Sequence, residues 1–209
     1  MTDTQQEYKH KIPTLSTNPR FGPMGITMKR ILFVIFHVIL VLAMRRFEIV
    51  ATIHALIVFV VGAYIALASE DIKAIIPVLG YIAGAEVLWR MTDANIFWEF
   101  GKYATIGILI IAIFKKNDLK LKGGPIFLFL FLTPSIILTI NFLGVTERAR
   151  QLISFNLSGP LTLSLCLSFF SQMELSCREL EKWTWGVVYP VLGILTLAVY
   201  STITATEIV

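Results

Sequence analysis

The sequence predicts an all-α protein, a polytopic bundle of about seven transmembrane helices. Apolar residues make up 56% of the 209 residues and charged residues only 15%, whereas soluble domains of this length are about half apolar and about a quarter charged. The apolar residues are gathered in long runs rather than spaced at a helical or strand period, a pattern typical of segments that face lipid. Lipid is therefore the expected solvent.

The elements follow from the apolar runs. Residues 1–28 are polar and contain three prolines, so they are predicted to be a disordered tail. No secretory signal is expected, because no charged start leads directly into a short apolar run with a small-residue cleavage site. Residues 29–209 are predicted to be one transmembrane helical domain. The seven helix candidates are residues 31–44, 49–68, 74–91, 103–114, 125–143, 160–170 and 186–203.

These runs differ in length. The second, fifth and seventh are long enough to cross a hydrocarbon core of about 30 Å. The first, fourth and sixth must borrow flanking residues, tilt, or stop part way across. The helix count is therefore uncertain by one.

The orientation is predicted from the lysines and arginines of the loops. With a cytoplasmic amino terminus and seven crossings, the basic residues that lie outside are Arg45, Arg46, Arg90, Lys102, Arg148 and Arg150, and the other twelve of the eighteen lie inside. If the first run were only an interfacial helix, every later loop would change side. A cluster of four lysines between residues 115 and 122 would then face outward, which violates the same rule more severely.

Glu86 is the first polar signal inside a predicted helix, because an ionised side chain at the bilayer centre costs about 3 kcal/mol or more. It precedes Arg90 by four residues, so both lie on one helical face toward the outer side. Two interpretations stay open. The residues either form a structural ion pair that holds their helix against its neighbours or line the polar wall of an outward-facing site.

Charged and aromatic residues alternate between residues 90 and 103, at a predicted membrane interface. The aromatic residues suit the headgroup level, and Asp93 is typical of turns and helix caps. Glu99 and Lys102 are three residues apart and are expected to pair across one helical turn. The segment is either an ordinary interfacial belt with a cap or part of the same site.

Arg148 and Arg150 fall in an outer loop, against the positive-inside bias, which indicates an anionic partner. Arginine holds phosphate oxygens through its planar fork. Ser158-Gly159-Pro160 is predicted to open the next helix and to present free backbone N–H groups near the same surface. A membrane lipid with an anionic headgroup is the expected ligand. The alternative is a solvated loop in which Glu147 pairs with Arg150.

No metal, cofactor or nucleic acid is expected to bind. His37 and His54 stand singly in apolar runs without a second ligand at metal spacing, so they are predicted to be core histidines. Cys166 and Cys177 lack the spacing of a metal knuckle or a redox pair. The sequence has no Walker loop, dinucleotide fingerprint or nucleophile elbow, so nucleotide-driven and soluble-type hydrolase chemistry is not expected.

The O-antigen ligase and O-antigen polymerase-like bacterial membrane proteins resemble this chain in two stretches, residues 81–103 (YIAGAEVLWRMTDANIFWEFGKY) and 153–160 (ISFNLSGP). The likeness runs from about residue 29 to residue 209 and is generic outside these stretches. It implies a protein of the bacterial inner (plasma) membrane that acts on undecaprenyl-diphosphate-linked glycans at the outer face. Arginines near that face bind the lipid diphosphate in such proteins.

The resemblance also implies site residues and a partner. Arg148 and Arg150 match the diphosphate-binding role best, followed by Arg90 and Lys102, with Glu86, Asp93 and Glu99 as a supporting polar network. Family members continue into a large outer loop that holds the proposed catalytic histidine. Here no histidine lies in a predicted outer loop, so no catalytic residue is predicted. A carboxy-terminal partner chain is expected to complete a metal-independent lipid-linked glycan transferase.

Two other function classes stay open. One is a polysaccharide transporter or flippase-like subunit, in which Glu86, Arg90, Glu99 and Lys102 line a polar path. That class favours discontinuous helices at similar positions in two halves, and the sequence has no clear internal repeat. The other is a non-catalytic scaffold subunit whose loop charges only set the topology.

Overall fold

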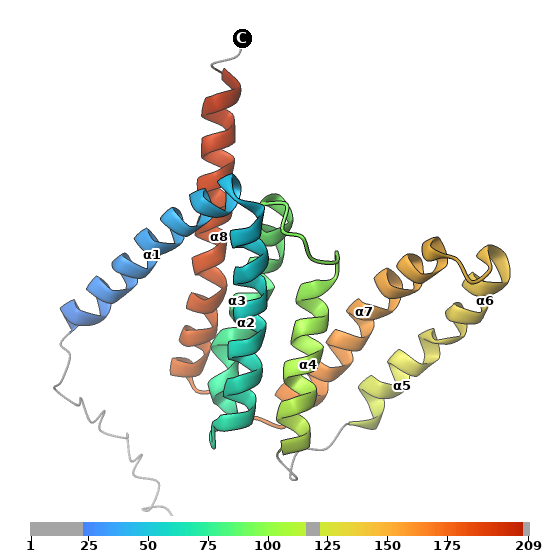
Figure 1. Cartoon of the computed structure of the whole chain (residues 1–209). Coiled ribbons are helices and arrows are strands. Elements are labelled where there is room, and N and C mark those ends of the chain that lie inside the picture. Colours follow the sequence, from blue (N-terminus) through green and yellow to red (C-terminus); the bar gives the residue numbers. More distant parts are fainter. Residues whose placement is uncertain (1–22, 116–121, 207–209) are drawn as a thin grey trace, which may run out of the picture.

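The computed structural model describes residues 23–115 and 122–206, and within these ranges the chain is helical without any strand. The helices are α1 (Pro23–Arg46), α2 (Glu48–Ala68), the 3-10 helix η1 (Ile72–Ile75), α3 (Ile76–Met91), α4 (Phe100–Lys115), α5 (Gly123–Leu132), α6 (Pro134–Leu143), α7 (Glu147–Phe170) and α8 (Cys177–Thr206). They run up and down between two ends of a bundle (Figure 1). The predicted all-α bundle is confirmed.

Six segments of the described chain are long and apolar enough to cross a membrane, which makes the chain an integral membrane protein. They are Thr27–Arg46, Glu48–Ala68, Ile72–Met91, Gly123–Leu143, Glu147–Phe170 and Cys177–Thr204. The remaining helix, α4, has 16 residues and is about 24 Å long. It packs against α2, α3 and α7 and links the two ends of the bundle (Figure 1), so α4 and the six longer segments run in alternating directions.

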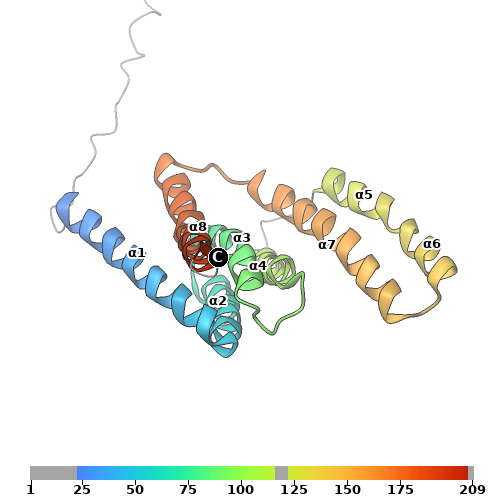
Figure 2. The same ribbon diagram turned by 90° about the horizontal axis from the view of Figure 1, so that it is seen from above.

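We call the end at which α1, α3, α5 and α8 begin the near end, and the end at which α2, α4 and α7 begin the far end. At the near end, α1 leans away from α2 (Figures 1 and 2). On the opposite flank of the bundle, α5, α6 and α7 lean outward as a group (Figures 1 and 2). The apolar core lies between α2, α3, α4 and α7 and contains Trp89, Ile108 and Phe169.

The start of α1 differs from the predicted boundary. The helix begins at Pro23, so residues 23–28 of the predicted tail are helical, and residues 1–22 lie outside the described part. Proline is favoured in the first turn of a helix, because its missing N–H has no intrahelical partner there.

The prediction that Ser158-Gly159-Pro160 opens a helix was wrong. Helix α7 begins at Glu147 and continues through Pro160 to Phe170. Thr146 provides the stronger start signal, because its Oγ1 accepts a hydrogen bond from the backbone N–H of Ala149 at 3.2 Å.

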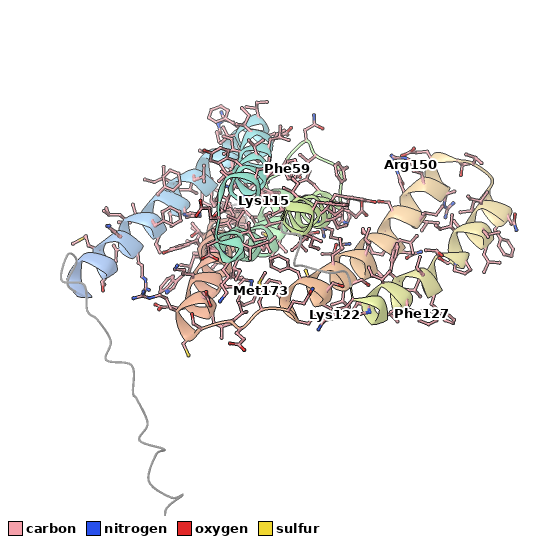
Figure 3. The ribbon with its side chains drawn as sticks, turned by 90° about the horizontal axis from the view of Figure 1, so that it is seen from below. Phe59, Lys115, Lys122, Phe127, Arg150 and Met173 are labelled. Carbon is pink, nitrogen blue, oxygen red and sulfur yellow. The ribbon has the colours of Figure 1, made fainter. Side chains whose placement is uncertain are left out.

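The fifth predicted run is divided into α5 and α6 at Thr133 and Pro134. Proline cannot donate the backbone hydrogen bond that would continue the helix. Two hydroxyl groups compensate at the break: Thr133 Oγ1 donates to the carbonyl of Leu130 at 2.8 Å, and Ser135 Oγ donates to that of Leu132 at 2.7 Å. Neither helix has a buried residue, and Phe127 of α5 lies on the outer edge of the bundle (Figure 3).

Helices α3 and α8 pack backbone against backbone. A Cβ atom added at Gly80 would lie 2.7 Å from the carbonyl oxygen of Trp183, and one at Gly84 would lie 2.6 Å from that of Val187. Gly186 of α8 meets the carbonyl oxygen of Pro77 in the same way. Such small-residue contacts let transmembrane helices approach closely, and the G-x-x-x-G spacing in α3 is their usual sequence pattern.

Replacing Gly84 by alanine is expected to lower the stability of the protein in detergent by about 1–3 kcal/mol, because the new methyl group overlaps the Val187 carbonyl. Gly159→Ala is the matched control: it also lies inside a helix, but nothing lies within 4 Å of its added Cβ. Thermal unfolding followed by circular dichroism measures both. Equal melting temperatures for the two variants would contradict the packing role of Gly84.

Candidate functional site

All seven residues predicted to form a site lie toward the far end of the bundle. They come from the last turns of α3, from residues 92–99 between α3 and α4, and from the first turns of α4 and α7. These residues are Glu86, Arg90, Asp93, Glu99, Lys102, Arg148 and Arg150. Segments that are far apart in the sequence therefore bring the predicted residues to the same end.

The connection between α3 and α4 is fixed by hydrogen bonds from its own side chains and from α2. Thr92 Oγ1 donates to the carbonyl of Leu88 at 2.9 Å, and Asn95 N–H donates to Thr52 Oγ1 at 2.8 Å. Asp93 adopts φ 54°, a left-handed conformation that aspartate tolerates better than most residues. Its carboxylate lies 3.5 Å from Arg45 Nη1 at the end of α1. The predicted role of Asp93 as a turn residue is confirmed.

Arg90 is held by three neighbouring groups. Its Nη2 donates to Glu86 Oε1 and, at 3.0 Å, to the carbonyl of Trp98, and its Cζ lies 4.3 Å from the Trp98 ring centroid. The Glu86 carboxylate packs in turn against Gly101, where an added Cβ would lie 3.0 Å from Oε2. The predicted Glu86–Arg90 ion pair is confirmed. It lines a cavity of about 350 Å³ together with Asp93.

A larger cavity of about 790 Å³ lies between residues 97–99 and the first turns of α4 and α7. Arg148, Arg150 and Glu99 line it, so three predicted residues share one cavity. Its other lining residues are Phe97, Trp98, Tyr103, Gln151, Leu152, Ser154 and Phe155. We call it the far-end cavity. Figure 3 labels Arg150 near the start of α7 and Lys122 before α5, at opposite ends of this flank of the bundle.

The basic residues around the far-end cavity differ in their pairing. Arg150 Nε donates to Glu147 Oε2 at 2.8 Å, and a second bond joins Arg150 Nη2 to Glu147 Oε1. Both side chains are largely exposed, so the pair adds little stability. Arg148 and Lys102 form no ion pair with any described residue. They are therefore the cations most available to an anionic ligand.

The predicted pairing of Glu99 with Lys102 was wrong, since no ion pair joins them in the described chain. Lys102 Nζ instead lies 5.3 Å from the ring centroid of Phe155 on α7, where a cation is attracted to the aromatic face. Glu99 is buried and lines the far-end cavity. A cross-helix contact has thus displaced the local one.

The free backbone N–H groups also lie at a different position from the predicted one. They belong to the first turn of α7, beside Arg148, rather than to residues 158–160, which lie inside the helix. The N–H of Ala149 is already bonded to Thr146. A helix amino terminus and two arginines therefore do occur together, although on a different part of the sequence from the predicted one.

The four residues of the predicted polar path, Glu86, Arg90, Glu99 and Lys102, do not share either of these two cavities. Glu86 and Arg90 line the smaller cavity, Glu99 lines the far-end cavity, and Lys102 lines neither. The two cavities share the side chains of Phe97 and Trp98. Aromatic residues thus separate the charged groups into two neighbouring sites at one end of the bundle.

The sequence analysis missed a buried hydrogen-bonded chain that links α1, α2 and α3. Trp89 Nε1 lies 2.9 Å from His54 Nδ1, and the Tyr81 hydroxyl lies 2.9 Å from both His54 Nε2 and His37 Nε2. His37 Nδ1 lies 2.8 Å from the carbonyl oxygen of Phe33. The prediction of a core histidine is confirmed for His37, which is buried, whereas His54 is only partly buried.

The direction of every bond in this chain follows from its two ends. The Trp89 indole only donates, so His54 accepts at Nδ1 and donates from Nε2 to the Tyr81 oxygen. The Tyr81 hydroxyl then donates to His37 Nε2, and His37 donates from Nδ1 to the Phe33 carbonyl. This arrangement needs both imidazoles neutral. The sequence did contain a signal for this chain: His37 and His54 stand in apolar membrane helices, where a polar side chain needs a hydrogen-bond partner.

None of the family models, curated proteins or solved structures compared with this chain matches it. The fold and the site are therefore the only observations that define the class of protein. It is an all-α integral membrane protein with a basic and aromatic cavity at one end of its helices.

Replacing Tyr81 by phenylalanine is expected to destabilise the protein by about 1 kcal/mol or more, because His54 and His37 both lose their partner in a buried site. Tyr64→Phe is the control, since Tyr64 is 68% exposed on α2. Thermal unfolding in detergent measures both variants. If Tyr81→Phe melts at the temperature of the parent protein, the hydrogen-bonded chain does not stabilise the fold.

Proposed function

We propose that the far-end cavity binds the diphosphate of an undecaprenyl-diphosphate-linked glycan, as part of an O-antigen ligase or polymerase-like membrane protein in cell-envelope polysaccharide assembly. The observation that carries the proposal is the lining of this cavity. Two arginines of the first turns of α7 face an aromatic wall at an end of a membrane-spanning bundle. Diphosphate and lipid need these two kinds of surface next to each other.

Arg148 would provide the first contact, because it lines the cavity without an ion-pair partner among the described residues and arginine binds phosphate oxygens through its planar fork. Lys102 does not line the cavity, but it lies over the ring of Phe155, which does, and would add its charge from there. Arg150 would join them by releasing Glu147, at small cost for so exposed a pair. Arg90 lies in the neighbouring cavity and would act on the same charge at longer range.

We propose that a second, apolar cavity next to the far-end cavity binds the polyprenyl chain of the ligand. An apolar cavity of about 360 Å³ lies between the end of α6 and the start of α7, with Ile140, Val145 and Ile153 in its lining. It shares Tyr103, Arg150 and Ser154 with the far-end cavity. A diphosphate at the arginines would therefore lead directly into an apolar surface on the lipid side.

The proposal includes a location. The far end would face outward from a bacterial inner membrane, with the amino terminus in the cytoplasm. The support is the distribution of basic residues: within the described ranges six belong to the far end and seven to the near end, and the sequence predicts the other five on the cytoplasmic side. No described residue is assigned a catalytic role, and the transfer step is proposed to depend on a carboxy-terminal partner chain.

The double substitution Arg148→Ala/Arg150→Ala is expected to weaken binding of undecaprenyl diphosphate by about tenfold or more, because each charge-assisted hydrogen bond contributes about 1.5–3 kcal/mol. The full-length protein in nanodiscs and a fluorescent undecaprenyl diphosphate provide the titration. Arg45→Ala/Arg46→Ala removes the same charge at the same end, away from the far-end cavity. Unchanged affinity, or equal loss in both double variants, would contradict the proposal.

Replacing Glu147 by glutamine is expected to tighten diphosphate binding by about two- to fivefold, because Arg150 then binds the ligand without first breaking an ion pair with the Glu147 carboxylate. Glu70→Gln changes the net charge equally but lies in the turn at the near end, and its affinity should match that of the parent protein. The same titration measures both. No change with Glu147→Gln would indicate that the Glu147–Arg150 pair is only a solvated ion pair.

A further inference from the structure

A second large cavity lies at the near end, on the opposite side of the membrane from the far-end cavity. It has a volume of about 730 Å³ and lies between α1, α2, α3 and α8, where α1 leans away from its neighbours (Figures 1 and 2). Its size falls within the range of about 300–1,000 Å³ that is usual for small-molecule sites. We call it the near-end groove. Nothing in the proposed function uses it.

The mouth of the groove is basic. Helix α8 presents Arg178, Lys182, Trp185 and Tyr189 to it, at the spacing i, i+4, i+7 and i+11 of a single helical face. Arg30 of α1 completes the mouth, packed 4.5 Å from the Trp185 ring centroid and paired with Glu181. Three basic residues and one acidic residue line the groove, so its net charge is positive.

Two of these cations have no local counter-charge. Arg178 and Lys182 are exposed and form no ion pair within the part of the chain described. The nearby carboxylate of Glu179 is already engaged, since it lies 3.1 Å from Lys73 Nζ and accepts a bond from the backbone N–H of Ser176. The positive charge at the mouth is therefore not neutralised by the protein itself.

The lining that α2 and α3 contribute to the groove is mostly apolar. Ile57 and Val61 of α2 line one wall, and Pro77 and Val78 of α3 line the next. Tyr81 of α3 also lines the groove, and its hydroxyl is held between His37 and His54. The groove is thus basic and aromatic on the side of α8 and mostly apolar on the sides of α2 and α3.

We propose that the near-end groove binds one anionic phospholipid of the surrounding bilayer. The phosphate lies at Arg178 and Lys182, the glycerol region lies beside Trp185 and Tyr189, and an acyl chain lies along Ile57, Val61 and Val78. Charge complementarity selects this ligand, because a zwitterionic headgroup leaves the positive mouth unneutralised. Basic pockets between transmembrane helices are a recurrent form of recognition for anionic headgroups.

The test is native mass spectrometry of the delipidated full-length protein, titrated with phosphatidylglycerol or with phosphatidylcholine of the same acyl chains. One phosphatidylglycerol molecule is expected to bind at least about tenfold more tightly than phosphatidylcholine. Arg178→Gln/Lys182→Gln is expected to remove this preference. Equal affinity for the two lipids, or an unchanged preference in this variant, would overturn the proposal.

A second pair of variants tests the acyl-chain part. Val61→Trp fills the groove and is expected to weaken phosphatidylglycerol binding about tenfold, whereas Val60→Trp, its neighbour on α2 outside the groove, is expected to have no effect. Circular dichroism checks that each variant is folded. If Val61→Trp binds normally and millimolar inorganic phosphate displaces the lipid, the site holds a free anion only, and the lipid proposal fails.

The two ends of the bundle are distinguished in the same experiment. Arg148→Ala/Arg150→Ala is expected to keep the phosphatidylglycerol preference, because those arginines line the far-end cavity. Loss of the preference in that variant would move the bound lipid to the far end and overturn the near-end site. Failure of undecaprenyl diphosphate binding alone would leave the near-end groove unaffected.

Discussion

The direct contact between the backbones of α3 and α8 is the constraint on which both cavities depend. Lipid tails are as apolar as leucine, so helices in a bilayer gain little from the hydrophobic effect and associate through close packing. Gly80, Gly84 and Gly186 remove the side chains that would hold these helices apart. Their approach places the basic face of α8 and Tyr81 of α3 in the lining of one groove, and the last turns of α3 continue to the far end.

The other helices attach to this pair in two ways. Apolar packing joins α2, α4 and α7 to α3 around Trp89 and Phe169. Helix α1, which leans away at the near end, is joined by apolar packing of Val41 and Met44 toward the far end and by polar contacts through His37 and the Arg30–Glu181 pair. These polar contacts lie on one edge of the near-end groove. The groove therefore exists because α1 is fixed along α8 while its separation from α2 widens.

Much of the fold could be predicted from the sequence, because long apolar runs indicate membrane helices directly. The Glu86–Arg90 pair could also be predicted, because its members are four residues apart and therefore lie on the same face of one helix. The start of α7 was missed because residues 147–157 mix charged and apolar residues, while a proline suggested a later start. The Glu99–Lys102 pairing failed because Phe155 comes from another helix. Contacts between helices depend on tilt and rotation, which no single run specifies.

The hydrogen-bonded chain from Trp89 to Phe33 has a consequence for how the protein responds to the membrane potential. Moving one elementary charge through a potential of 100 mV changes its energy by about 2.3 kcal/mol. Both imidazoles of the chain are neutral, and each proton has one donor and one acceptor. This hydrogen-bonded chain between α1, α2 and α3 thus carries no gating charge. Energising or depolarising the membrane exerts no net force on it.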